Sequence, residues 1–161
     1  MNIAFAIDFI DILEPQYDKS IAPEKYCEKL SLIKSSAISS KYDNTLIIGA
    51  DTIVLLDDIV LGKPASKKDA YLTLKSLSGK SHKVITGVTI IYNDLIHTFH
   101  DTTTVRFRKL DDVDIKKYIN SNSPYDKAGS YGIQDYSAIF VSSISGCYDN
   151  VVGFPLSKFY Y

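Results

Sequence analysis

The stretch between residues 46 and 56 constrains the fold of this chain more than any other part of it. Its first half, Leu46–Ala50, is a short and continuously apolar run, which is typical of a central strand covered on both faces. Asp51 follows directly, and a second apolar stretch, Thr52–Leu56, comes after it. These residues predict strands within a sheet that other elements pack against.

Further strands are predicted where apolar residues alternate along the chain or where Thr, Val and Ile are frequent. Two long strands are expected to meet at a turn formed by Asn93 and Asp94, and a tight turn at Asp57 and Asp58 is expected to join two others. The additional expected strands cover residues 2–12, 59–61, 84–92 and 96–108, with short ones around 139–141 and 151–152.

Helices are predicted between these strands by apolar side chains that recur every three or four residues. Ser66, with Asp69 three positions later, has the pattern of a helix N-terminus, and Gly79 is suited to ending the same helix. The expected helices begin at Pro23, Ser66, Asp111 and Pro155. This alternation predicts an α/β fold with a mixed sheet flanked by helices.

No boundary between domains is visible in the 161 residues. The chain has no internal repeat, no low-complexity tract and no linker rich in Pro, Gly or Ser. Its hydrophobic content of 45% is enough for a core of ordinary size. We therefore expect one domain that spans residues 1–161.

Charge and cysteine content argue against several classes of protein. Eighteen Lys and Arg against nineteen Asp and Glu leave a net charge of −1, without the basic excess of a general nucleic-acid binder. No apolar stretch approaches the ~20 residues of a membrane span. Asp8 and Asp11 interrupt the apolar residues near the N-terminus, and no basic residues lead them, which argues against a secretory signal. Cys27 and Cys147 are too few and too far apart for a disulfide framework. We expect a cytoplasmic protein that binds neither nucleic acid nor membrane.

Asp51 and Lys63 are the first candidates for chemistry. A carboxylate inside an apolar stretch is costly to leave unpaired, so Asp51 is either a structural residue held by backbone donors or lies at the carboxyl end of a strand, facing a ligand, metal or water. Lys63 stands between Gly62 and Pro64, where a constrained backbone can present its ammonium to phosphate. The same pattern also fits a solvated loop lysine.

Three further residues extend this set. Lys34 lies at the edge of the apolar stripe of the first expected helix, so its ammonium points into a cleft or reaches past the core to water. Glu14 can pair with Asp51 around a divalent cation, because hard cations prefer carboxylate oxygens, or it is an ordinary surface residue. Residues 126–134 combine two glycines for close backbone approach with the amide of Gln134, which can read a base edge, although a polar loop has the same composition.

The histidines carry weaker signals. His97 and His100 have His-x-x-His spacing, but an offset of three on a strand points the two side chains to opposite faces, which favours surface or core residues over a metal pair. His82 lies beside Ser81 without a partner at nucleophile spacing, and no Gly-x-Ser-x-Gly motif is present. Covalent hydrolase chemistry therefore has little support.

Five segments, in this order, resemble the motifs of the Maf family and together span nearly the whole chain. They are Ile48–Val54, Leu61–Pro64, Leu77–Val88, Asp126–Gln134 and Asn150–Leu156. The resemblance implies a Maf- and ITPase-like fold, a homodimer, and an enzyme that hydrolyses a nucleoside triphosphate between its α and β phosphates. It also implies dependence on a divalent cation, Mg²⁺ or Mn²⁺.

Roles for individual residues follow from the same resemblance. The residue that matches Asp51 is taken in the family as the proton acceptor that activates water, and those that match Glu14, Lys34 and Lys63 line the phosphate and metal site. Phosphoryl chemistry depends mainly on positioning and charge neutralisation, which makes two carboxylates and two lysines a reasonable set.

Two further matches concern the base of the nucleotide. Thr52 and Gln134 correspond to family positions associated with base choice, in the pattern of the subgroup that acts on dTTP and UTP. The resemblance therefore implies dTTP or UTP as the substrate, together with modified nucleotides.

One family feature has no counterpart in the sequence. Members begin with a strand and a Ser-x-Ser-Pro-Arg-Arg loop that contacts the phosphates, and nothing similar precedes Asn2. We therefore expect an N-terminally truncated version of the fold. Because that loop supplies phosphate contacts, the alternatives to a pyrophosphatase are a nucleotide-binding or regulatory protein without catalysis, and a different metal-dependent phosphohydrolase.

Overall fold

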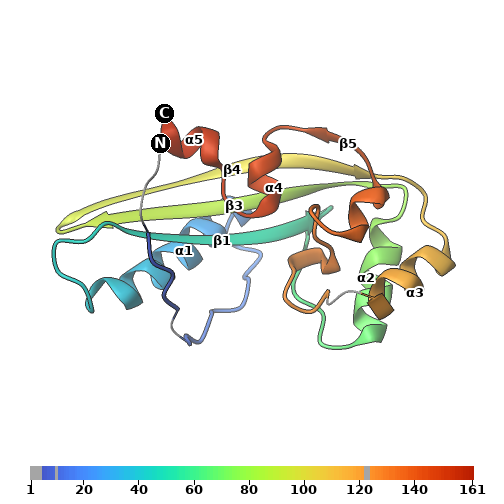
Figure 1. Ribbon diagram of the computed structural model, residues 1–161, viewed down its shortest axis with the longest axis horizontal. Coiled ribbons are helices and arrows are strands. Elements are labelled where there is room, and N and C mark those ends of the chain that lie inside the picture. The colour runs from blue at the N-terminus through green and yellow to red at the C-terminus, as the bar shows by residue number, and fades with distance from the viewer. Residues whose placement is uncertain (1–4, 10, 122–123) are drawn as a thin grey trace.

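The computed structural model describes residues 5–9, 11–121 and 124–161. Within them, one five-stranded sheet has the order β2-β1-β3-β4-β5, and every neighbouring pair is antiparallel (Figure 1). The strands are β1 (Ile47–Leu56), β2 (Ile59–Leu61), β3 (Ser81–Tyr92), β4 (Leu95–Phe107) and β5 (Val141–Ser145). The helices are α1 (Pro23–Ser39), α2 (Lys67–Leu77), α3 (Asp112–Ser121), α4 (Tyr148–Val152) and α5 (Leu156–Tyr160), with short 3-10 helices at Ala128–Ser130 and Tyr136–Phe140.

The α/β class with a sheet flanked by helices is confirmed, whereas the sheet that was expected to be mixed pairs all its strands antiparallel. The predicted local signals also hold at the start of α2, where the Ser66 hydroxyl accepts a hydrogen bond from the Asp69 backbone N–H. The expected turn at Asn93 and Asp94 joins β3 to β4, and Asn93 adopts a φ of 50°, which asparagine tolerates. None of the helices formed by the described residues has the length and apolar character that a membrane crossing requires.

Two of the predicted strands near the chain ends are wrong. Residues 5–9 and 11–12 lie in no strand, while the remainder of the expected strand 2–12 falls outside the described residues. Phe5, Ile7 and Phe9 alternate but are more than 80% exposed, because alternation does not supply the neighbouring strand that a ladder needs. Val151 and Val152 belong to helix α4.

The expected strands 46–50 and 52–56 form the single strand β1, so Asp51 lies within a strand. The strand expected around 139–141 begins only at Val141, because the preceding residues form a 3-10 helix.

Helices cover both faces of the sheet. On β3, Gly87 faces α1 so closely that an added Cβ would lie 2.4 Å from the backbone carbonyl of Cys27. The preceding residue, Thr86, points to the opposite face and donates to the carbonyl of Asn150 in α4. In Figure 1, α1 lies below the strands, α4 overlaps β3 and β4 in the view, and α2 and α3 lie at one end.

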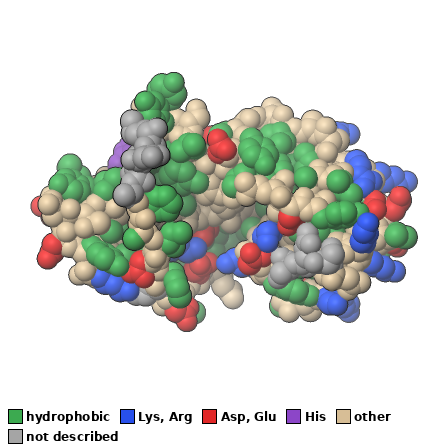
Figure 2. Space-filling model, in the orientation of Figure 1, with side chains coloured by type: hydrophobic (Ala, Val, Ile, Leu, Met, Phe, Trp, Pro, Cys, Tyr) green, Lys and Arg blue, Asp and Glu red, His purple; other side chains and the backbone are tan. Residues whose placement is uncertain are grey.

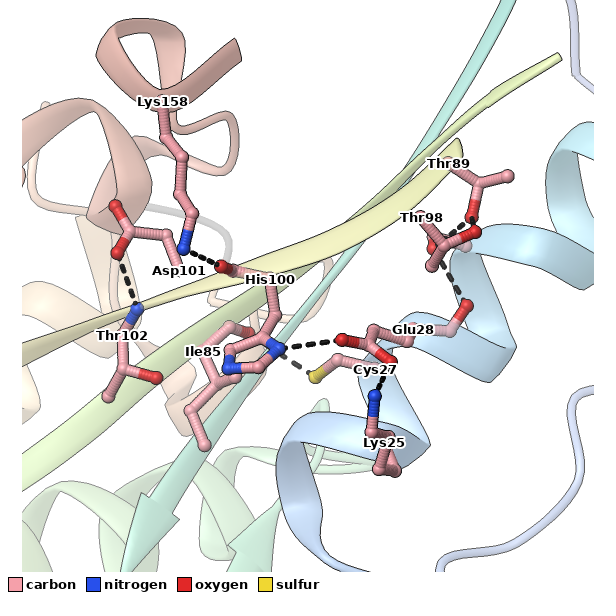
Figure 3. Close-up of polar contacts among 11 residues, drawn as sticks. Lys25, Cys27, Glu28, Ile85, Thr89, Thr98, His100, Asp101, Thr102 and Lys158 are labelled. Carbon is pink, nitrogen blue, oxygen red and sulfur yellow. Dashed lines mark hydrogen bonds and ion pairs between the residues drawn. The ribbon is translucent and has the colours of Figure 1, made fainter. Parts of the chain in front are cut away.

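Polar contacts hold α1 to the sheet. The Ser31 hydroxyl of α1 lies 2.8 Å from that of Thr89 on β3, which lies 3.0 Å from that of Thr98 on β4 (Figure 3). Beside them, His100 Nδ1 lies 2.7 Å from the Glu28 carboxylate of α1. Because the positions of Ser31 and Glu28 are set by these bonds, the helix has a fixed place against the strands.

The two histidines of β4 point to opposite faces, as the strand offset predicts. The His100 ring faces α1 through its contact with Glu28, as Figure 3 shows. The His97 ring lies beside Phe99, with ring centroids 5.7 Å apart, and Phe99 faces away from α1 because side chains alternate along the strand.

Candidate active site

Asp51 lies in the middle of β1, opposite Gly87 of β3, and its side chain faces α1. Lys34 of α1 donates a hydrogen bond to the Asp51 carboxylate and also contacts the Glu14 carboxylate at 2.9 Å. The expected position at the carboxyl end of a strand is wrong, because β1 continues to Leu56. The helix, not a strand end, gives the carboxylate its cationic neighbour.

Partial burial shapes the charges of this trio. The side chains of Asp51, Lys34 and Glu14 are 11%, 29% and 43% exposed. Burial raises the pKa of Asp51 above its ordinary value, against the opposing effect of the hydrogen bond from Lys34. Burial alone would lower the pKa of Lys34, but the hydrogen bonds to Asp51 and Glu14 outweigh it and the pKa is raised. The result is a stronger carboxylate base beside a firmly protonated lysine.

The trio lies at a free edge of the sheet. Strand β2 pairs only with Val54–Leu56 of β1, so among the described residues 47–53 pair with β3 alone. Successive side chains of a strand point to opposite faces, which places Thr52 on the face away from Asp51. A ligand that wraps around this edge can therefore reach both residues.

Two cavities flank this edge. One, of about 400 Å³, is lined by four residues predicted from the sequence: Asp51, Thr52, Lys63 and Gln134. The other, of about 360 Å³, is lined by Glu14 and Lys34, and Ala50 lines both. Figure 2 shows a hollow near the middle of this face, with acidic and basic side chains along its rim. The six predicted residues thus line two adjoining cavities, which meet at Ala50 and at the contact of Lys34 with Asp51 and together form the cleft at this edge.

Lys63 is exposed at the rim, and the described residues provide it with no hydrogen bond or ion pair. Its charge is close enough to act on both Asp51 and Asp126. Asp126 itself pairs with Lys127 at 2.8 Å. Lys63 is therefore available for an anionic ligand in the cleft.

The glycines of the 126–134 segment do approach other groups closely, but these belong to the protein. Gly129 has a φ of 68°, and a Cβ there would lie 2.9 Å from the Val54 side chain. A Cβ on Gly132 would lie 2.6 Å from the Lys127 side chain. Gly129 lets the segment pack against β1, and Gln134 of the same segment lines the larger cavity.

Sequence reasoning missed several residues of the cleft. Thr86 hydrogen-bonds to Thr52 across the two strands, a contact visible only once the register of β1 and β3 is known. Tyr131 lines the larger cavity, and its hydroxyl lies 2.8 Å from Nε2 of the buried His82. Burial lowers the pKa of His82 to about 4, so this histidine is a neutral core residue.

The donor chemistry of the cleft suits a hard cation better than a soft one. No group of three or more His, Cys, Asp or Glu residues in the described part of the chain is placed to hold a metal ion. Asp51 and Glu14 nevertheless present two carboxylates to the same lysine. Mg²⁺ is commonly held by one or two carboxylates together with substrate phosphates and water, which this pair fits.

Fold and cleft together define a class: an α/β protein with a charged cleft at the free edge of an antiparallel sheet. The family model of Maf-like proteins matches residues 1–161. The chain belongs to the Maf family.

The chain is similar to several bacterial proteins named dTTP/UTP pyrophosphatase. That of Ruminiclostridium cellulolyticum is 46% identical over 160 residues, which cover 98% of this chain and 83% of that protein. That of Thermosipho africanus is 47% identical over 155 residues, covering 94% and 79%. That of Thermosipho melanesiensis is 51% identical over 136 residues, covering 84% and 73%.

Proposed function

We propose that this protein is a nucleoside triphosphate pyrophosphatase that hydrolyses dTTP and UTP, and modified forms of them, to the monophosphate and pyrophosphate. One observation carries the proposal: Lys34 contacts both Asp51 and Glu14 at the sheet edge, in the cleft that Lys63, Thr52 and Gln134 also line. The names of the relatives support the same activity.

Asp51 is the proton acceptor in the proposed reaction. A water oxygen bonds to the α phosphorus, the bond from that phosphorus to the α–β bridging oxygen breaks, and pyrophosphate leaves with that oxygen. The proton of the water passes to the Asp51 carboxylate. Burial raises the pKa of Asp51, which makes the carboxylate a stronger base than one in open water.

The lysines and a divalent cation balance the charge of the triphosphate. Lys63 at the rim and Lys34 beside Asp51 can each donate to phosphate oxygens. Glu14 and Asp51 would hold Mg²⁺ or Mn²⁺, which neutralises phosphate charge when it is bound. Thr52 and Gln134, which line the larger cavity, would contact the base.

The test is product analysis with dTTP, UTP, dCTP and purine triphosphates, each with Mg²⁺, with Mn²⁺ and with EDTA. We expect release of pyrophosphate, not orthophosphate, from dTTP and UTP, and none after chelation. Asp51→Asn should lower kcat by about 100-fold or more because the general base is lost.

Asp57→Asn is the matched control, since Asp57 lies in the exposed turn after β1 and asparagine tolerates its φ of 53°. Release of orthophosphate would point to a different phosphohydrolase. Calorimetric binding of dTTP without any turnover would replace the proposal with a nucleotide-binding protein.

A further inference from the structure

A chain of hydrogen bonds runs from the cleft into the core. The hydroxyl of Thr52, which lines the larger cavity beside Gln134, lies 2.8 Å from the hydroxyl of Thr86. Thr86 Oγ1 in turn lies 3.0 Å from the backbone carbonyl oxygen of Asn150 in α4. Thr86 and Asn150 are both fully buried, so water does not compete for these contacts.

This series of hydrogen bonds has only one favourable direction from donor to acceptor. A carbonyl oxygen can only accept, so the single hydroxyl proton of Thr86 goes to Asn150. Thr86 must then accept from Thr52, whose own proton is used in that bond. The opposite orientation would set lone pairs of Thr86 Oγ1 and of the Asn150 carbonyl oxygen against each other at 3.0 Å in a buried site, which is unfavourable.

The fold holds the carbonyl of Asn150 in place. The side-chain amide of Asn150 donates to the carbonyl of Val84 at 3.0 Å and to the hydroxyl of Thr103 at 3.1 Å. Thr103 donates in turn to the carbonyl of Cys147 at 2.9 Å, just before α4. Because these bonds tie α4 to β3 and β4, the acceptor that orients Thr86 cannot turn away.

The consequence reaches the ligand through Thr52. With its proton committed to Thr86, Thr52 offers only lone pairs to the cavity, whereas the Gln134 amide can both donate and accept. Uracil and thymine carry an N–H at ring position 3, between two carbonyl groups. Cytosine has a bare nitrogen acceptor there, which would oppose the Thr52 lone pair.

We propose that Thr86, oriented by Asn150, is a positioning residue that makes Thr52 a hydrogen-bond acceptor, so that the cleft selects uracil and thymine nucleotides over cytosine nucleotides. This inference rests on the proposed function. In this arrangement Thr86 lies inside the sheet and influences base choice only through Thr52, which faces the ligand.

The test compares kcat/KM for dTTP and dCTP in wild type, Thr86→Val and Thr86→Ser. Valine keeps the shape of threonine without the hydroxyl, which frees Thr52 to donate to cytosine. We expect the ratio of kcat/KM for dTTP to that for dCTP to fall about tenfold in Thr86→Val, the equivalent of one hydrogen bond. Thr86→Ser keeps the hydroxyl and should keep the ratio.

A general loss of structure lowers both rates together and leaves the ratio unchanged, so the ratio isolates the positioning role. Thr86→Ala supplies the same comparison if the valine variant does not fold. If the wild type prefers dTTP and the ratio for Thr86→Val or Thr86→Ala equals the wild-type ratio, the inference is overturned while the proposed function stands. Absence of pyrophosphate release from every triphosphate by the wild type would instead overturn the proposed function.

Discussion

At the scale of the residue, the cleft depends on one lysine held between two carboxylates. Lys34 contacts Asp51 and Glu14 together, and this is why a half-buried ammonium stays protonated at the edge of the core. The same contact opposes the effect of burial on the pKa of Asp51. In the proposed reaction, Lys34 therefore lowers the pKa of the base as well as binding phosphate.

Replacement of Lys34 by methionine tests this effect on the pKa. The hydrogen bond and the charge of Lys34 lower the pKa of Asp51, so their loss raises it, and the carboxylate is protonated from a higher pH downward. We expect the acidic limb of the kcat/KM profile for dTTP to move to higher pH. We also expect the plateau to fall by about tenfold or more, since a charge-assisted hydrogen bond to phosphate is lost.

Lys25→Met is the control for this profile. Lys25 lies on the same helix but is exposed and pairs with Glu28, away from the cleft. Its variant should reproduce the wild-type profile. An acidic limb that stays in place in Lys34→Met would show that Asp51 is not the group that titrates.

At the scale of the element, the distance between α1 and the sheet sets the geometry of the cleft. Two strand glycines allow the close approach: a Cβ at Gly49 would lie 2.7 Å from the carbonyl oxygen of Ser31, and one at Gly87 2.4 Å from that of Cys27. Gly87 also stands opposite Asp51 in the strand register. A helix moved away from this face would carry Lys34 away from Asp51.

Gly87→Ala should consequently lower both stability and activity. The added methyl group meets backbone atoms of α1, which cannot rotate aside, and overpacking of this kind typically costs about 1–3 kcal/mol. The unfolding midpoint in urea measures the loss. Gly62→Ala is the matched control, because a Cβ there meets nothing within 4 Å. Equal midpoints for the two variants would contradict the account of how α1 packs.

At the scale of the whole molecule, the sheet separates two hydrophobic clusters. One gathers under α1, around Leu30 and Ile85, and the other lies on α2 and α3, around Leu74, Phe107 and Tyr118. The cleft lies at the edge of β1, which contributes side chains to both clusters. The homodimer implied by the family resemblance stays a prediction, and analytical ultracentrifugation would check it.

Acid should destabilise the whole fold through His82. This ring is 3% exposed and its pKa is lowered to about 4 by burial, whereas an unfolded histidine titrates near 6.5. As the pH falls below 6.5, the unfolded chain gains a proton that the folded chain takes up only near pH 4. We expect a loss of about 2–3 kcal/mol in the free energy of unfolding between pH 7.5 and 4.5 from this residue.

The comparison is urea unfolding of wild type and His82→Gln at the two pH values. Glutamine can still hydrogen-bond to Tyr131 but does not titrate, so its variant should lose less stability on acidification. His97→Gln, on the exposed part of β4, should follow the wild type. Identical losses in wild type and His82→Gln would show that the buried ring does not drive the acid sensitivity.

The sequence by itself determined the features that depend on near neighbours. The Ser66 cap, the Asn93–Asp94 turn and the start of α1 at Pro23 are decided by residues a few positions apart, so their patterns are legible without a fold. The candidate residues of the cleft are indicated by their positions beside apolar or constrained stretches and by the family resemblance, and the structure brings them together.

Only the tertiary structure decided the relations between distant residues. The alternation at residues 5–9 found no strand to pair with among the described residues, and Val151 and Val152 became helical where Asn150 bonds to the sheet. The contact of Lys34 with Asp51 and the orientation of Thr52 by Thr86 likewise required the helix packing and the strand register. Such contacts join residues far apart in the chain, so their free energies depend on partners that no local pattern identifies.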